Sequence, residues 1–121
     1  FKNQQSVEYE SMGVHITNDL KEAPYIFVVR LDVNLDHENE FNEIYNSEHF
    51  PYVMKTSGML RGARFRTTFN GDVQRYMTLF EMDNPGIPYT KEFRANADYG
   101  AWPEYVRPHT CRAQRVVFKR L

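Results

Sequence analysis

Two predicted β-strands of this chain carry apolar side chains on both of their faces, and this pattern limits what the chain can fold into. Residues 25–33 open with five apolar side chains in a row, and residues 75–82 keep both sides largely apolar. A strand of this kind is buried on both faces in the folded protein. The sheet that contains these two strands therefore needs a cover on each side.

Helical spacing follows the first strand. Phe41, Ile44 and Tyr45 recur at the spacing of one helix face, and Asp36 is placed to cap the helix N-terminus. We expect Pro51 to break or restart the helix, because proline lacks the N–H that a helix interior needs. The remaining predicted elements are a strand at 59–69, a turn at 70–72, a return strand at 75–82, a helix at 88–98, a loop at 99–109 and a last strand at 110–119.

This order of elements, β-α-β-β-α-β, predicts an α+β fold of the ferredoxin-like type. Its four strands form one antiparallel sheet, and both helices lie on the same face. Residues 25–121 make up this domain. Residues 1–24 are more polar and are expected to form an N-terminal extension with at most a short strand or hairpin, since Val7 and Tyr9, and then Val14 and Ile16, alternate only weakly.

The sheet face that the helices leave open decides the expected assembly. Apolar burial contributes about 25 cal/mol per Å², so a whole exposed apolar face would forfeit many kcal/mol. A second copy of the sheet, packed face to face by a two-fold axis, covers this face most economically. We therefore expect a homodimer, with higher oligomers left open.

Composition removes several classes of function. The chain has 15 basic and 16 acidic residues, a net charge of −1, which favours neither nucleic acid nor a polybasic membrane anchor. No apolar run approaches the roughly 18–20 residues of a membrane span, and we find no signal peptide, so a cytoplasmic protein is expected. The single cysteine, Cys111, excludes an internal disulfide, and no histidine spacing indicates a metal site.

Residues 40–66 read EFNEIYNSEHFPYVMKTSGMLRGARFR and resemble the EthD-like branch of the dimeric α+β barrel proteins. The matching positions are Phe41, Asn42, Tyr45, Glu48, His49, Pro51, Gly58, Ala63, Arg64 and Arg66. Residues 75–85 and Trp102 also fit the family pattern. The chain departs from it at Ile44, Phe50 and Ser57. The resemblance implies a dimeric α+β barrel, in a superfamily of cofactor-free monooxygenases, polyketide cyclases, lactone isomerases, haem-degrading enzymes and members without known activity.

His49 and Tyr45 are the candidate catalytic residues. A neutral imidazole transfers protons at ordinary pH, and Tyr45 lies one helical turn earlier on the same face. The pair could polarise a carbonyl and move a proton on an aromatic or enolisable substrate. The structural alternative is that His49 orders the end of the helix and that Tyr45 belongs to the core.

Substrate binding is assigned to residues on the strands and the late loop. Arg64 and Arg66 share one strand face and could hold a carboxylate or phenolate, although strand-edge ion pairs with acids such as Glu81 would explain them equally well. Aromatic side chains, among them Tyr76 and Trp102, could wall an apolar pocket, or simply form the core and the dimer interface. His109 is a second-rank pocket candidate.

Three functions remain open. The leading hypothesis is a small homodimeric enzyme without an obligatory cofactor or metal, which isomerises, cyclises or oxidises a small aromatic, polyketide-like or lactone substrate. The second is a module that binds a small apolar or aromatic ligand, or serves assembly, without chemistry. The third is haem binding and degradation through one axial histidine. Whether the chain is an enzyme is left undecided by the sequence.

Overall fold

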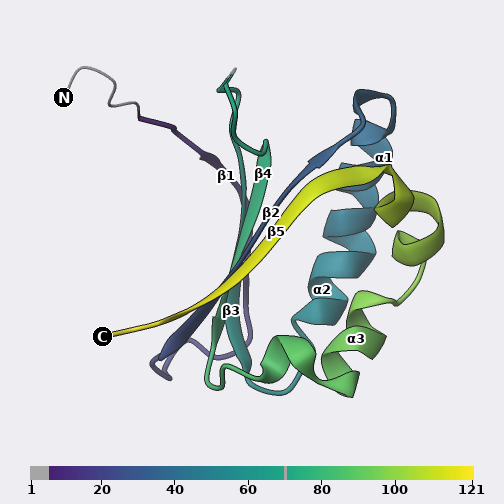
Figure 1. Cartoon of the computed structure of the whole chain (residues 1–121). Coiled ribbons are helices and arrows are strands. Elements are labelled where there is room, and N and C mark those ends of the chain that lie inside the picture. The colour runs from purple at the N-terminus through teal and green to yellow at the C-terminus, as the bar shows by residue number, and fades with distance from the viewer. Residues whose placement is uncertain (1–5, 70) are drawn as a thin grey trace.

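The computed structural model describes residues 6–69 and 71–121 and consists of one antiparallel sheet with a layer of helices on one face (Figure 1). The strands follow the spatial order β1-β3-β4-β2-β5. Their bounds are β1 Glu10–Ile16, β2 Tyr25–Val33, β3 Met59–Arg66, β4 Tyr76–Met82 and β5 Thr110–Lys119. The helices are α1 Glu38–Ile44, α2 Phe50–Val53 and α3 Lys91–Ala97.

The sheet has five strands, so the prediction of four is wrong. The order β3-β4-β2-β5 is that of the ferredoxin-like fold, and β1 adds to it at the free edge of β3, pairing Val14 with Ala63 and Ile16 with Arg61. This pairing satisfies backbone groups that an open β3 edge would expose. The sequence pattern of β1 is weak because its apolar side chains are not buried: Val14 is 63% and Ile16 is 54% exposed to solvent. The turn predicted at 70–72 includes Asn70, which lies outside the described residues.

Of the two outcomes expected at Pro51, the restart is confirmed and the break is wrong: a short second helix, α2, begins at Phe50, and the helical backbone is not interrupted. Helical backbone runs from Glu38 to Val53 because a π-helical segment, Tyr45–His49, joins α1 to α2, and the N–H of Phe50 donates to the carbonyl of Tyr45 five residues back. Pro51 lies in the first turn of α2, where its missing N–H is tolerated. Such π-turns inside α-helices are frequent at functional sites.

Both helix starts differ from the prediction. Asp36 is not the cap: the side chain of Asn34 accepts from the N–H of Asp36 at 3.0 Å and starts a 3-10 turn two residues earlier. The helix predicted at 88–98 begins only at Lys91, where Thr90 caps it by accepting from the N–H of Phe93. The segment predicted as the loop 99–109 is largely helical, with a π-turn at Trp102–Val106 and a 3-10 turn at Arg107–His109.

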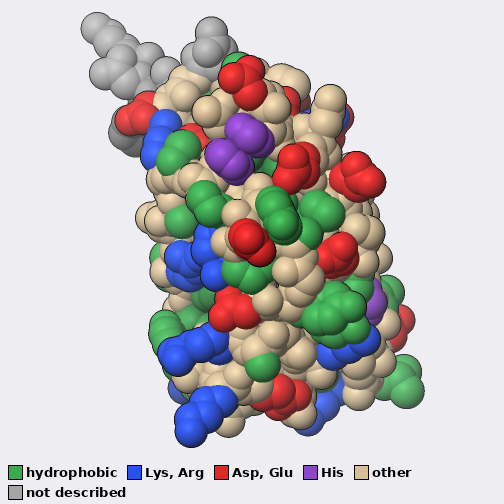
Figure 2. All heavy atoms as spheres, turned by 90° about the vertical axis from the view of Figure 1, so that its right-hand side faces the viewer, with side chains coloured by type: hydrophobic (Ala, Val, Ile, Leu, Met, Phe, Trp, Pro, Cys, Tyr) green, Lys and Arg blue, Asp and Glu red, His purple; other side chains and the backbone are tan. Residues whose placement is uncertain are grey.

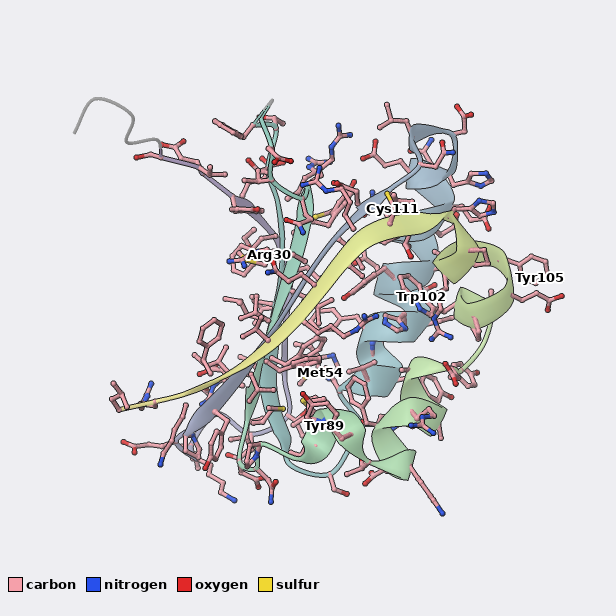
Figure 3. All side chains as sticks on the ribbon, viewed as in Figure 1. Arg30, Met54, Tyr89, Trp102, Tyr105 and Cys111 are labelled. Atoms are coloured by element: carbon pink, nitrogen blue, oxygen red, sulfur yellow. The ribbon has the colours of Figure 1, made fainter. Side chains whose placement is uncertain are left out.

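The two faces of the sheet differ in their cover. Phe27 and Phe80 point to the helices and are 2% exposed, and there they join Phe41 and Val53 in the core. Strand alternation places the opposite residues on the uncovered face, where Figure 3 shows Arg30 pointing away from the helices. That face carries mostly apolar side chains, namely Val14, Ile16, Ile26, Val28, Ala63, Phe65, Met77, Leu79, Val116 and Phe118.

The helical side is different in character. There, acidic and basic side chains are mixed with isolated hydrophobic ones (Figure 2). Within residues 6–69 and 71–121, no helix is both long enough and apolar enough to cross a membrane.

Candidate functional site

A cavity of about 70 Å³ lies between β2 and β5 on one side and the helices on the other. This is several times the roughly 10–15 Å³ that one water molecule requires. Its apolar walls include Phe27, Leu31, Phe80, Phe93 and Trp102. Its polar lining residues are Tyr45, His49, Arg107 and Arg115. The two arginines are exposed, whereas Tyr45 and Trp102 are buried, so the arginines mark the mouth of the cavity.

His49 ends the π-helical segment and lies against Trp102. The two ring centroids are 3.9 Å apart with planes 15° from parallel, and the Tyr45 ring approaches the imidazole edge-on at 5.0 Å. The His49 Nδ1 atom is buried and has no hydrogen-bond partner among the described residues. A buried polar atom without a partner is uncommon in native proteins and calls for an explanation.

The protonation state of His49 follows from its surroundings. Burial lowers the pKa of His49 to about 3, and the positive charges of Arg107 and Arg64 act in the same direction. The backbone carbonyl of Ala97 and the carboxylate of Asp98 raise this pKa but do not offset burial. The imidazole is therefore neutral at ordinary pH. We assign its proton to Nε2, because an N–H on the buried Nδ1 would have no acceptor among the described residues.

Tyr45 lies beside His49 and is 3% exposed. Its hydroxyl is 2.6 Å from the hydroxyl oxygen of Thr78 on β4. Burial raises the pKa of Tyr45, and the hydrogen bond to Thr78 and the charges of Arg64 and Arg115 only partly counter it. Tyr45 is thus a neutral phenol that either donates or accepts a hydrogen bond.

Trp102 is held over His49 by a contact between the helix and the segment that follows α3. The Glu48 carboxylate accepts the N–H of Ala101 at 2.8 Å. Gly100, directly before it, has φ +72°, and a Cβ at this position would overlap the Glu48 carboxylate. Figure 3 shows Trp102 within the helical layer, beside the long helix that carries His49. Glu48 therefore orients a loop amide, which places Trp102 against His49.

Arg64 and Arg66 share a strand face, yet neither lines the cavity. Arg64 is 1% exposed, donates to the side-chain oxygens of Asn46 at 2.7 Å and Asn42 at 3.0 Å, and lies 4.0 Å over the Tyr45 ring. Burial lowers the pKa of Arg64. Arg66 forms an ion pair with Glu10 of β1 at the sheet edge.

Two other predicted binding residues lie away from the cavity lining. Tyr76 is buried in the core, where its hydroxyl donates to Glu38 at 2.7 Å and accepts from Asn42 at 2.9 Å. His109 stacks on His37 with ring centroids 3.4 Å apart, and a pair of adjacent histidines is visible near the top of Figure 2. Of the predicted catalytic and binding residues, the cavity brings together His49, Tyr45 and Trp102, and two further aromatic residues expected as possible pocket walls, Phe80 and Phe93, also line it.

Sequence reasoning missed Arg107, Arg115 and Thr78. Arg107 lies in a segment predicted as a loop, and Thr78 looked like an ordinary strand residue. Arg115 had a usable signal, because strand alternation puts it on the same face as Val117, which packs on the core. Among the described residues, no cluster of three His, Cys, Asp or Glu side chains is arranged to hold a metal.

Comparison with known proteins finds similar folds. No family model and no curated protein matches the chain. An EthD family protein from Bacillus halodurans C-125 has a TM-score of 0.58 at 13% identity, over 80% of this chain and 99% of that one. A candidate monooxygenase from Fusobacterium nucleatum subsp. nucleatum has a TM-score of 0.63 at 11% identity, over 95% of this chain and 57% of that one.

A third similar structure is a major regulator of staphylococcal pathogenesis, with a TM-score of 0.64 at 10% identity, over 98% of this chain and 74% of that one. Identities this low establish a shared fold. The predicted resemblance to EthD-like proteins is therefore confirmed at the level of the fold. Fold alone does not select an activity.

Proposed function

We propose that this chain is a small homodimeric enzyme, without an obligatory cofactor, that acts on a small aromatic, polyketide-like or lactone substrate by acid-base chemistry. The observation that carries the proposal is the unpartnered, buried Nδ1 of His49 in a cavity that also contains Tyr45. A neutral imidazole nitrogen with a free lone pair is a hydrogen-bond acceptor and a base for a bound hydroxyl or an acidic C–H.

His49 is the general base and acid of this mechanism, and Tyr45 is its hydrogen-bonding partner. Tyr45 can donate its proton to a substrate carbonyl while Thr78 supplies a hydrogen bond to the phenol oxygen. A pKa of about 3 makes His49 a weak base in the free protein. A bound anion close to Arg107 would offset the positive charge of that arginine and so raise the pKa of His49. The pKa of His49 would then lie closer to the operating pH, where general acid-base catalysis is most effective. Isomerisation, cyclisation and O₂-dependent oxidation all begin with such a proton transfer.

The dimer part of the proposal rests on the uncovered sheet face. Val28 and Leu79 are paired neighbours at its centre, and Val116 and Ala63 flank them on the adjoining strands. Val28 is already only 6% exposed among its neighbours. A second sheet packed on this face would therefore bury mainly the partly exposed Leu79, Val116 and Ala63, at about 25 cal/mol per Å² of apolar surface.

Turnover tests the catalytic part. A panel of small aromatic ketones, β-diketones and lactones is screened for binding through the indole N–H signal of Trp102, the one tryptophan of the chain. Binders are then assayed for conversion by the wild type, His49→Gln and Tyr45→Phe. We expect the His49 variant to lose roughly 10²- to 10⁴-fold in kcat, the range of general acid-base catalysis. Conversion by His49→Gln at the wild-type rate would remove the mechanism.

One observation favours a binding module as the second candidate. The weak basicity of His49 suits a hydrogen-bond acceptor that recognises a ligand without deprotonating it. In that case compounds from the panel bind, His49→Gln weakens their binding, and none is converted.

Haem does not fit the cavity as it stands. A volume of about 70 Å³ is far smaller than a porphyrin. We therefore assign no step to haem. Titration with haemin should leave its Soret band where free haemin has it, and a shifted band that disappears in His49→Gln would reverse this assignment.

A further inference from the structure

The polar lining of the cavity has an unbalanced charge. Two of its four polar residues are arginines, the other two are the neutral His49 and Tyr45, and none of its lining residues is acidic. Arg107 is already engaged, since its guanidinium donates to the Asp98 carboxylate at 2.6 Å. Arg115 forms no ion pair with any residue in the described ranges 6–69 and 71–121. One positive charge at the mouth of the cavity is thus left without a counter-charge.

The position of Arg115 directs this charge toward the cavity. Arg115 lies opposite Val29 in the β2–β5 ladder, and Val29 lines the cavity. Side chains at opposite positions of an antiparallel pair lie on the same face of the sheet, so Arg115 extends on the helical side. The field inside the cavity is positive as well, because the charges of Arg107 and Arg64 lower the pKa of His49 and those of Arg64 and Arg115 lower the pKa of Tyr45.

The remaining walls define the shape and the second polar contact of a ligand. Phe27, Phe80, Phe93 and Trp102 supply flat apolar surfaces, which suit a planar ring. No described residue donates a hydrogen bond to His49 Nδ1, so a ligand hydroxyl or enol that reaches this buried atom would satisfy it.

We propose that the cavity binds a small planar carboxylate that also carries a hydroxyl or enol, with the hydroxyl donating to His49 Nδ1 and the carboxylate held by Arg115 beside Arg107. Because the cavity encloses only about 70 Å³, the carboxylate end of such a ligand stays outside it, at the mouth that the two exposed arginines form. The proposal rests on the proposed function for the identity of the site and adds the class of substrate. A carboxylate is favoured over a phosphate because its single charge matches the one unpaired arginine and its planar oxygens match the guanidinium fork.

The three hydroxybenzoates and the corresponding hydroxybenzamides test whether binding requires a negatively charged carboxylate on the ligand. The acid and the amide have the same shape and the same hydroxyl, and they differ in charge. Each is titrated into the full chain while the indole signal of Trp102 is followed by NMR. We expect at least one hydroxybenzoate to bind at least tenfold more tightly than its amide, since a hydrogen bond to an ionised partner contributes roughly tenfold to a hundredfold in affinity. Equal affinity for acid and amide, or no binding of any hydroxybenzoate, would overturn the proposal.

Variants on β5 then assign the anion contact. Arg115→Gln should weaken hydroxybenzoate binding about tenfold and leave hydroxybenzamide binding unchanged. Lys119→Gln is the matched control, because Lys119 is an exposed cation on the same strand and the same side but does not line the cavity. An equal loss in both variants would mean that only the general charge of the strand matters, and it would overturn the assignment to Arg115. Unsubstituted benzoate should bind more weakly than the best hydroxybenzoate, and this difference should disappear in His49→Gln.

The outcomes separate this inference from the proposed function. Arg115-dependent binding of a carboxylate by a protein that converts none of the compounds supports the ligand class and contradicts catalysis. Conversion of a neutral substrate that depends on His49 but not on Arg115 supports catalysis and contradicts the ligand class.

Discussion

Replacing Gly100 with alanine should destabilise the protein by about 3 kcal/mol and release Trp102 from His49. Gly100 has φ +72°, a left-handed conformation that costs an ordinary residue about 1–2 kcal/mol. The new Cβ would also overlap the Glu48 carboxylate, which must move and give up its hydrogen bond to the N–H of Ala101. A hydrogen bond to a charged group contributes about 1.5 kcal/mol, and the two costs together give the estimate.

Urea denaturation measures this cost as a lower transition midpoint at unchanged slope. Gly86→Ala is the matched control, because Gly86 has φ −82° and its added Cβ would only approach Asn84 at 3.3 Å, so its effect should stay within about 0.5 kcal/mol. In a Glu48→Ala background, Gly100→Ala should cost only the conformational part, giving a coupling of about 1 kcal/mol or more. A Gly100→Ala protein within 0.5 kcal/mol of the wild type would refute the reasoning.

Three further predictions address the assembly, the buried arginine and the buried histidine. Leu79→Arg places a charge at the centre of the uncovered sheet face, so this variant should sediment as a folded monomer where the wild type sediments as a dimer. A wild type that sediments as a folded monomer at micromolar concentration would contradict the dimer. Arg64→Ala should lower the free energy of unfolding by about 3 kcal/mol, because it leaves the Asn42 and Asn46 side-chain oxygens without donors. Arg64→Lys should recover only part of this loss, since one ammonium does not replace the fork, and a loss below 1 kcal/mol in Arg64→Ala would contradict this account. His49 should make stability depend on pH: its pKa is about 3 in the folded protein and roughly 6.5 when unfolded. Between about pH 6.5 and about pH 3 the unfolded state binds more protons, so His49 should lower the free energy of unfolding by about 1 kcal/mol for each pH unit that the pH falls. Urea denaturation of His49→Gln at several pH values should show a weaker dependence of this free energy on pH. The same pH dependence in the wild type and in His49→Gln would show that His49 is not held neutral.

The strands of the core could be predicted from the sequence because each carries a local signal. The apolar residues of β2 and β4 and the basic but alternating β5 occur close to where they were expected, and their order follows from the ferredoxin-like topology. β1 was foreseen only as a possible short strand, and its place in the sheet was missed. Its stability comes from pairing with the edge of β3, a long-range interaction that leaves almost no apolar pattern in residues 10–16.

The site was predictable only in part, for a similar reason. His49 and Tyr45 stand four residues apart on one helix, and that spacing alone brings them together. The helix continues past Pro51 because of a π-turn, and no residue pattern in the sequence predicts that turn. Arg107 and Arg115 reach the same cavity from segments about 60 residues away in sequence. Strand alternation gives the face on which Arg115 lies, but only the packing of the C-terminal segment brings either arginine to His49. The anion anchors predicted on β3 instead satisfy local partners, Asn42 and Asn46 for Arg64 and Glu10 for Arg66.

The central claim is that a neutral His49 offers a free Nδ1 lone pair to a ligand, and long-range ¹H–¹⁵N NMR of the histidine side chains tests it most directly. Comparison with His49→Gln assigns the signals. The account predicts that His49 carries its proton on Nε2 and stays neutral down to about pH 4, and that its Nδ1 resonance moves when a hydroxybenzoate binds. A His49 that is protonated on Nδ1, that titrates near its ordinary pKa of about 6.5, or whose Nδ1 is unaffected by a bound hydroxybenzoate would contradict it.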